Sequence, residues 1–246
     1  MSGHSKWANI KHRKGKSDEQ KGRAFTRIGR EIAVIVRQGG PDPNVNYALR
    51  DVIVKAKRAN MPGDNIAKCI KKASGEGGSE DYESLSYEGY GPGGVAVIIE
   101  AMTDNRNRTA GDVRHLLDKH GGNLGSNGCV SYLFDRKGLI VVDREGSSAP
   151  GALDEDAAMM EALDAGAEDF KAMEGWYEVI TDPSEFYAVS TALESKGYAF
   201  LSAEVGMVPK VTVGLADPRH AGQMERMIDA IEGLDDVQGV FHNWDQ

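Results

Sequence analysis

Hydrophobic and polar positions alternate with two different periods along the chain, and the period changes near residue 75. Up to that point, apolar residues recur every three or four positions, which is typical of helices that bury one face. The stripe that predicts the first helix consists of Phe25, Ile28, Ile32, Ile35 and Val36. Ser17 and Gln20 have the spacing of a capping box before this stripe, and Gly39-Gly40-Pro41 ends it. Val34 is the one residue that does not fit this pattern, because it is apolar but lies on the side of the helix that carries the arginines.

Two more helices are expected at about 46–59 and 64–74, each with one apolar face. Three short helices of this kind predict a small bundle whose apolar faces meet. The stretch 75–79 (Gly-Glu-Gly-Gly-Ser) then has the composition of a flexible joint and marks a domain boundary.

After the joint, strand patterns alternate with helix patterns. Residues 139–205 predict the order β-α-β-β-α-β, the split-βαβ arrangement of four antiparallel strands under two helices. Its strands are expected at 139–143, 168–173, 176–181 and 199–205, its helices at 154–165 and 184–196, and a tight turn at 136–138. The flanking segments predict the same order again, with strands at 95–102, 129–134, 210–215 and 237–242 and helices at 109–119 and 218–231.

These elements predict an α+β fold in which a basic three-helix domain precedes two ferredoxin-like (βαββαβ) domains, the third inserted into the second. The expected boundaries are 1–78 for the helical domain with its N-terminal arm, 79–135 plus 206–246 for the discontinuous domain, and 136–205 for the inserted acidic domain.

Charge separates the chain in the same way. Residues 1–75 contain seventeen of the 29 Lys and Arg residues but six of the 38 Asp and Glu residues, a net charge of +11. The remaining twelve basic and 32 acidic residues give −20, and the total of −9 conceals the contrast. A basic block on an acidic chain indicates a polyanionic partner, because each cation set against a phosphate releases a counterion. We therefore expect nucleic-acid binding through the N-terminal third.

The expected nucleic-acid-binding residues lie on the arm and on the outer faces of the three helices. At about 100° per residue, Arg23, Arg27 and Arg30 project away from the apolar stripe of the first helix. The full set is Lys6, Lys11, His12, Arg13, Lys14, Lys16, Lys21, Arg23, Arg27, Arg30, Lys55, Lys57, Arg58, Lys68, Lys71 and Lys72. Such contacts position a protein on a backbone without reading its sequence.

Residues 103–109 join a strand to a helix N-terminus and gather Asn105, Arg106, Asn107 and Arg108. This loop is a candidate phosphate site, since backbone N–H groups also point outward there. A capped loop whose arginines pair with nearby carboxylates explains it equally well. The G-x-G-x-x-G match at 89–94 precedes a strand, whereas a dinucleotide site follows one, so a turn is preferred there.

Catalytic and metal patterns are missing from the sequence. His115 and His120 are five apart and diverge on a helix, and Cys69 and Cys129 stand alone. No Ser or Cys has a nucleophile context. We expect a protein that is not an enzyme and uses no metal, cofactor or small-molecule substrate. The start lacks an apolar leader and the apolar runs are too short to span a bilayer, so a cytoplasmic protein without a membrane partner is expected.

Several long motifs closely resemble the YebC/PmpR family, and the similarity runs from end to end. They are Gly3-His4-Ser5-Lys6-Trp7 with the basic arm, Phe25-Thr26-Arg27, 87–94 (Tyr-Glu-Gly-Tyr-Gly-Pro-Gly-Gly), 103–109, 121–125, Met207-Val208-Pro209 and 237–243. The departures are mild: Arg27 replaces a usual Lys and keeps the charge, whereas Phe241 replaces a usual Tyr and loses a hydroxyl.

The resemblance implies a three-domain α+β protein without catalytic activity or cofactor. Its basic-domain role carries over onto Lys6, Lys11, Arg13, Lys14, Lys16, Lys21, Arg23 and Arg27. Bacterial members are described as DNA-binding transcriptional regulators, which gives the first functional expectation. The alternative is a ribosome-associated translation factor that contacts ribosomal or transfer RNA and assists elongation through proline-rich stretches, as a mitochondrial translational activator and some bacterial relatives imply.

Overall fold

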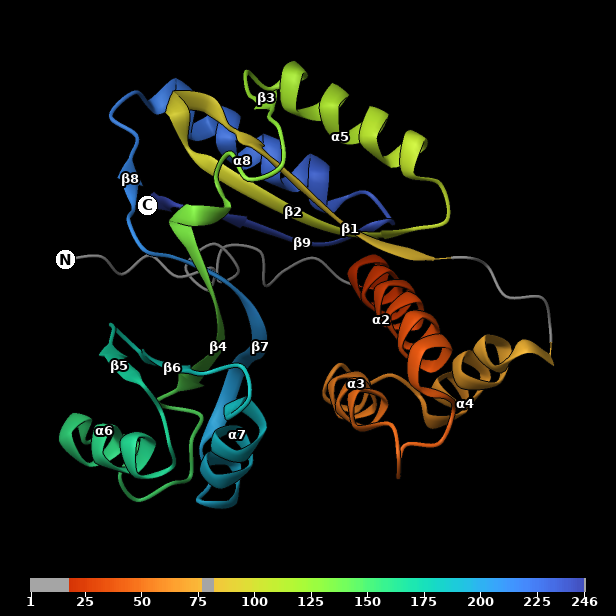
Figure 1. Cartoon of the computed structure of the whole chain (residues 1–246). Coiled ribbons are helices and arrows are strands. Elements are labelled where there is room, and N and C mark those ends of the chain that lie inside the picture. Colours follow the sequence, from red (N-terminus) through yellow and green to blue (C-terminus); the bar gives the residue numbers. More distant parts are fainter. Residues whose placement is uncertain (1–17, 77–81, 246) are drawn as a thin grey trace. The chain divides into compact units, whose positions relative to one another are not determined.

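The computed structural model describes residues 18–76 and 82–245 (Figure 1). Its first part is helical: α2 (Asp18–Gly39), α3 (Tyr47–Arg58) and α4 (Gly63–Lys71), with a π-helical turn over Lys72–Glu76. The three helices bury a common core, as their apolar stripes predict. Its fully or nearly buried members are Ile28, Ile32, Val36, Leu49, Val52, Ala56, Met61 and Ile66.

Asn46 fixes the corner between α2 and α3. Its Oδ1 accepts a hydrogen bond from the backbone N–H of Leu49 at 3.1 Å, which caps α3, and its Nδ2 donates to the carbonyls of Ile35 and Gly40 at 3.1 and 2.8 Å. The side chain is almost fully buried. The bond from Leu49 satisfies an N–H group that the start of α3 leaves without a helical partner, and the other two hold Asn46 against the end of α2.

The second part is built on a four-stranded sheet with the order β3-β1-β2-β9. Its strands are β1 (Glu83–Tyr90), β2 (Ala96–Thr103), β3 (Asn123–Leu124) and β9 (Val237–His242). Helices α5 (Arg106–Lys119) and α8 (Pro218–Glu232) belong to the same part and pack against each other. Residue 95 and the first four residues of β2, 96–99, are all at most 1% exposed. This burial explains why the strand begins as a continuous apolar run.

Three predictions for this sheet are wrong. The strand expected at 210–215 is the two-residue strand β8 (Val213–Gly214), which pairs with β10 (Trp244–Asp245) outside this sheet. The sequence did not predict β1, which pairs with β2 as a hairpin across residues 91–94, where Gly93 and Gly94 have positive φ. The expected strand at 129–134 is instead a 3-10 turn over Ser131–Leu133 that leads into β4. The sheet therefore begins with a hairpin in place of the expected β-α-β unit. The preference for a turn at the glycine-rich motif is confirmed.

Between β3 and α8 the chain forms β4 (Phe134–Asp143), α6 (Glu155–Asp164), β5 (Asp169–Ala172), β6 (Trp176–Thr181), α7 (Phe186–Ser195) and β7 (Ala199–Pro209). The sheet order is β5-β6-β4-β7 with antiparallel neighbours throughout, so the predicted split-βαβ order is confirmed. A two-residue parallel pair joins β8 (Val213–Gly214) to β10 (Trp244–Asp245).

The turn expected at 136–138 is wrong, because these residues lie inside β4. Gly138 serves close packing there: a Cβ at this position would lie 2.7 Å from the Phe186 ring and would also strike the Thr181 hydroxyl. Gly138, expected in a turn, is thus needed because neighbouring side chains pack too close to the strand for any larger residue.

The α+β class is confirmed, with a helical region followed by sheet domains. By contact density, the described residues form two compact units. One comprises 131–215 and 241–245, and the other comprises 18–76, 82–130 and 216–240. The helical region and the β1-containing sheet thus belong to one unit. The exact boundaries of three separate domains stay a prediction.

Candidate nucleic-acid interface

The basic residues expected at the interface fall into four groups. Those of the arm, Lys6, Lys11, His12, Arg13, Lys14 and Lys16, lie outside the described residues, as does the side chain of Lys21. Arg23, Arg27 and Arg30 lie on α2. Lys55, Lys57 and Arg58 lie on α3, and Lys68, Lys71 and Lys72 lie on α4 or directly after it.

The placement expected for Arg27 and Arg30 on the outer face of α2 is wrong. Arg27 donates to the backbone carbonyl of Glu232, and Arg30 donates to the carbonyl of Asp235. The Arg30 side chain is 14% exposed, and its Nη1 also lies 2.7 Å from Oδ1 of Asp236. Burial lowers the pKa of Arg27, opposed by the charge of Glu232. These two guanidinium groups therefore hold the helical region to the segment that follows α8.

Val34 is the sequence signal for this second contact. It is 8% exposed and follows Arg30 by one helical turn, on the side of α2 opposite the bundle core. A helix with apolar residues on both sides is covered on both sides. Val34 therefore indicates that a second face of α2 is covered by the rest of its unit. The positions of the arginines alone did not indicate this contact.

Asp236 is the centre of a buried polar cluster that sequence reasoning missed. Its Oδ2 accepts hydrogen bonds from the hydroxyls of Thr109 at 2.6 Å and Thr103 at 3.1 Å, and from Nη2 of Arg108 at 2.8 Å. Both threonines are at most 1% exposed. With Arg30 on Oδ1, this single carboxylate connects α2, the end of β2 and the start of α5.

The electrostatic balance at Asp236 favours its charged form. Burial alone would raise the pKa of Asp236, but the hydrogen bonds from Thr109, Arg108 and Thr103, together with the charge of Arg30, outweigh it and lower the pKa. The hydrogen bonds that Arg108 donates to Asp236 and Asp104 raise the pKa of Arg108. The cluster is therefore ionic at neutral pH.

The loop at 103–109 shows the contacts of a capped, carboxylate-paired turn. Asn105 Oδ1 accepts from the backbone N–H of Arg108 at 3.1 Å, and Arg108 Nη2 lies 2.7 Å from Asp104 in addition to Asp236. Arg106 lies 3.9 Å from Glu83. Arg106 and Asn107 are exposed, and phosphate binding by this loop stays a prediction.

Cations on α3 and α4 remain at the surface. Lys57, Lys68, Lys71 and Lys72 are exposed, whereas Arg58 is half-buried. Lys55 is exposed but pairs with Glu31 at 2.7 Å. The exposed positive surface of the described helical region is therefore carried by the lysines of α3 and α4 more than by the arginines of α2.

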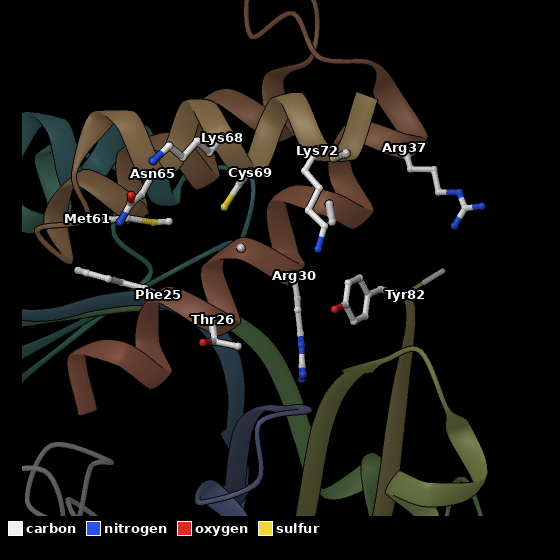
Figure 2. Close-up of a pocket in the computed structure, with 13 residues that line it drawn as sticks. Phe25, Thr26, Arg30, Arg37, Met61, Asn65, Lys68, Cys69, Lys72 and Tyr82 are labelled. Carbon is white, nitrogen blue, oxygen red and sulfur yellow. The ribbon is translucent and has the colours of Figure 1, made fainter. Parts of the chain in front are cut away.

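A groove of about 400 Å³ lies beside these lysines (Figure 2). Residues of α2 form one wall and residues of α4 the other, and Figure 2 shows Phe25 towards one end and Tyr82 at the other. Tyr82 lies beneath Arg30, whose guanidinium is 5.4 Å from the ring centroid. The lining residues are Phe25, Thr26, Gly29, Arg30, Ala33, Arg37, Met61, Asn65, Lys68, Cys69, Lys72, Ala73 and Tyr82.

Across 18–76 and 82–245, no helix combines the length and the apolar character that a membrane crossing requires. Fold and site together define a multidomain α+β protein that joins a cationic helical module to sheet domains rich in carboxylates. The chain belongs to the TACO1/YebC family. The model of the TACO1/YebC N-terminal domain matches residues 5–76, and that of the second and third domains matches residues 82–244.

Relatives match over nearly the whole length. A probable transcriptional regulatory protein of Acetivibrio thermocellus is 60% identical over 99% of each chain. One of Ruminiclostridium cellulolyticum is 56% identical over 100% of this chain and 97% of its own. The crystal structure of a conserved hypothetical protein from Aquifex aeolicus is 46% identical, with a TM-score of 0.85 over 98% of this chain and 96% of that one. Both of these bacterial relatives are thus regulatory proteins by name.

Proposed function

We propose that this chain is a non-enzymatic regulator that binds duplex DNA through the basic surface of its helical domain. The observation that carries the proposal is the row of exposed lysines at positions 57, 68, 71 and 72 on α3 and α4. The probable transcriptional regulatory proteins among its relatives support the same reading. The arm at 6–16 adds six more groups that can carry positive charge, as its sequence predicts.

Arg27 and Arg30 make contacts inside the protein, so the proposed interface does not include them and consists of the exposed lysines and the arm. Guanidinium groups that already bind carbonyls and a carboxylate have little to offer a phosphate. Exposed lysines are mobile point charges that suit a backbone of any sequence. The proposed contact surface is accordingly the α3–α4 side of the bundle, together with the basic arm that precedes α2 in the sequence.

The test measures how affinity depends on salt. Fluorescence anisotropy with a labelled duplex, repeated from low to high KCl, gives the slope of log K against log salt. Replacing Lys68, Lys71 and Lys72 together by Gln is expected to make this slope shallower by about one unit per lysine, because each lost phosphate contact retains its counterion.

A matched control removes three lysines from the unit that contains residues 131–215, outside the helical region: Lys171→Gln, Lys196→Gln and Lys210→Gln. Each of these pairs with a carboxylate in the described structure, so the change in net charge is the same while the proposed surface is intact. An equal loss of slope in both triple variants contradicts the proposal, because net charge alone would then explain binding.

The alternative partner, RNA on the ribosome, would use the same lysines, since phosphate contacts do not distinguish nucleic acids. Two measurements separate the partners. A regulator of transcription binds a specific promoter duplex more tightly than a scrambled one at physiological salt. A translation factor sediments with ribosomal particles in a salt-sensitive manner and shows no such duplex preference.

A further inference from the structure

The groove between α2 and α4 has a chemical character that phosphate binding alone does not require. Apolar and aromatic side chains form part of its lining, among them Phe25, Met61, Ala73 and Tyr82. Gly29 allows the two helices to approach, since a Cβ there would already touch Sγ of Cys69 at 3.4 Å. The volume of about 400 Å³ and this lining suit a flat, apolar group of modest size.

Charge in this groove has one sign. Arg30, Arg37, Lys68 and Lys72 all line it, and none of its lining residues is an Asp or Glu. Lys68 and Lys72 are exposed at its edge, and Figure 2 shows the Lys72 ammonium directed from α4 towards the space above Arg30 and Tyr82. A ligand that complements this groove carries negative charge outside and an apolar surface inside.

Asn65 adds a directional polar group. In Figure 2 its carboxamide lies near Met61 at the Phe25 end of the groove. Within the described part of the chain, this carboxamide has no hydrogen-bond partner. A free carboxamide offers one acceptor and two donors, which match the edge of a nucleobase.

We infer that the groove between α2 and α4 binds a single unpaired nucleotide, with its base on the apolar lining at the Phe25 end, beside Asn65, and its phosphates on Lys68 and Lys72. This inference rests on the proposed function, because it gives the nucleic acid a defined point of attachment. A base enters such a groove only when it is out of the helical stack, as at a bulge, a loop or a strand end.

The experiment compares three labelled duplexes of the same sequence: one fully paired, one with a single extrahelical adenosine, and one with an abasic residue in place of that adenosine. The full chain is expected to bind the adenosine bulge roughly tenfold more tightly than the other two, the range that aromatic stacking of one base gives. The abasic duplex separates recognition of the base from recognition of bent DNA.

Two variants test the groove itself. Asn65→Leu keeps the side-chain size and is expected to remove most of the preference for the bulge while the paired duplex binds within about twofold of wild type. Lys57→Gln, on α3 and outside the groove lining, is expected to weaken all three duplexes alike. Melting curves of both variants check that the fold is intact.

A second measurement does not depend on a groove variant. Cys69 lines the groove and is half-buried, and burial raises the pKa of its thiol. In a Cys129→Ser background it is the single cysteine. Its reaction with a maleimide is expected to slow at least fivefold in the presence of the bulged duplex and to change little with the paired one.

The possible outcomes separate a failure of the groove assignment from a failure of the proposed DNA-binding function. Equal affinity for the bulged and abasic duplexes, or no protection of Cys69, overturns the groove assignment and leaves phosphate binding standing. Free adenosine monophosphate that binds as tightly as the bulged duplex overturns the assignment to a nucleic-acid strand. Failure to bind any of the three duplexes at low salt removes the proposed DNA-binding function itself.

Discussion

The carboxylate of Asp236 receives hydrogen bonds from Arg30, Thr103, Arg108 and Thr109, and only 7% of the residue is exposed. A buried carboxylate with this many donors is stable because each donor compensates part of the lost hydration. Removing the charge leaves Arg30 buried against a neutral group. The cost of such a change comes mainly from the partner that stays behind.

Asp236→Asn is therefore expected to destabilise its unit by about 3 kcal/mol or more, measured by urea unfolding. Asp104→Asn is the matched control, because Asp104 is exposed and contacts the same Arg108 from the solvent side. Its expected cost is below about 1 kcal/mol. Equal costs would show that Asp236 acts only as another surface ion pair.

The pH dependence of stability follows from the lowered pKa of Asp236. A carboxyl group whose folded pKa lies below its unfolded value of about 3.9 contributes its full stabilisation above that value. The contribution is lost as pH falls through the folded pKa. Wild type is thus expected to lose more unfolding free energy than Asp236→Asn between pH 5 and pH 2, and parallel curves would contradict this.

Two glycines, Gly138 and Gly111, are expected to respond to substitution by alanine in opposite directions. Gly138→Ala places a methyl group against Phe186 and Thr181 inside β4, so a loss of about 1–3 kcal/mol is expected. Gly111 lies inside α5 with nothing within 4 Å of a built Cβ. Gly111→Ala is expected to stabilise by about 0.5–1 kcal/mol, because alanine favours the helix. Thermal unfolding should show a lower melting temperature for Gly138→Ala and a higher one for Gly111→Ala than for wild type.

Among the elements, α6 has its large apolar side chains on the outside. Ala158 and Ala162 are at most 2% exposed, whereas Met160 and Leu163 are 63% and 46% exposed. The small residues allow α6 to lie close to the core of its domain, which also contains Tyr177 and Leu193. Hydrophobicity alone would assign these faces the other way round.

Neighbouring substitutions in α6 should consequently differ in effect. Ala162→Leu is expected to cost about 1–3 kcal/mol because the buried site has no room for three more carbons. Leu163→Lys is expected to change stability by less than about 0.5 kcal/mol. Denaturant midpoints of the two variants decide the matter, and a larger loss for Leu163→Lys would reverse the assignment of faces.

Helices were predicted from the sequence more reliably than the first sheet. Periodicity and end signals placed α3, α6, α7 and α8 within about three residues at each end, because one buried face dictates the pattern. Strand β1 was not predicted because its sequence, Glu83–Tyr90, contains few aliphatic residues and only Glu88 and Gly89 are buried, so it has no apolar alternation. Its pairing with β2 is set by the hairpin turn, a non-periodic signal.

The candidate site was predicted in part. The sequence indicated which residues are basic but not which of them are exposed, since the burial of Arg27 and Arg30 depends on segments some two hundred residues further along the chain. Asp236 looked like one carboxylate among many in an acidic region. The groove could not be foreseen either, because Tyr82 and Asn65 share no motif and meet only after folding.

At the scale of the whole molecule, positive charge serves two separate purposes. Arg27 and Arg30 of α2 contribute to folding, whereas the lysines of α3 and α4 are proposed to bind nucleic acid. Charge reversal separates these purposes. Reversing Arg27 and Arg30 to Glu is expected to cost several kcal/mol of stability, because two buried anions would face backbone carbonyls and Asp236.

Reversing Lys68 and Lys72 to Glu is expected to leave the melting temperature within a few degrees of wild type and to reduce the salt slope of binding. Calorimetry and anisotropy on the same two variants give both quantities. Similar melting temperatures for the two variants would show that Arg27 and Arg30 are dispensable for folding and would return them to the interface.

Arg30 touches both of these systems, since it lines the groove and its guanidinium binds Asp236. Two equilibria that share one side chain are reciprocal: whatever ligand in the groove strengthens or weakens the Arg30–Asp236 contact is itself bound more tightly or more weakly to the same degree. A ligand in the groove that alters this contact would thereby affect β2 and α5 through the Arg30 guanidinium alone.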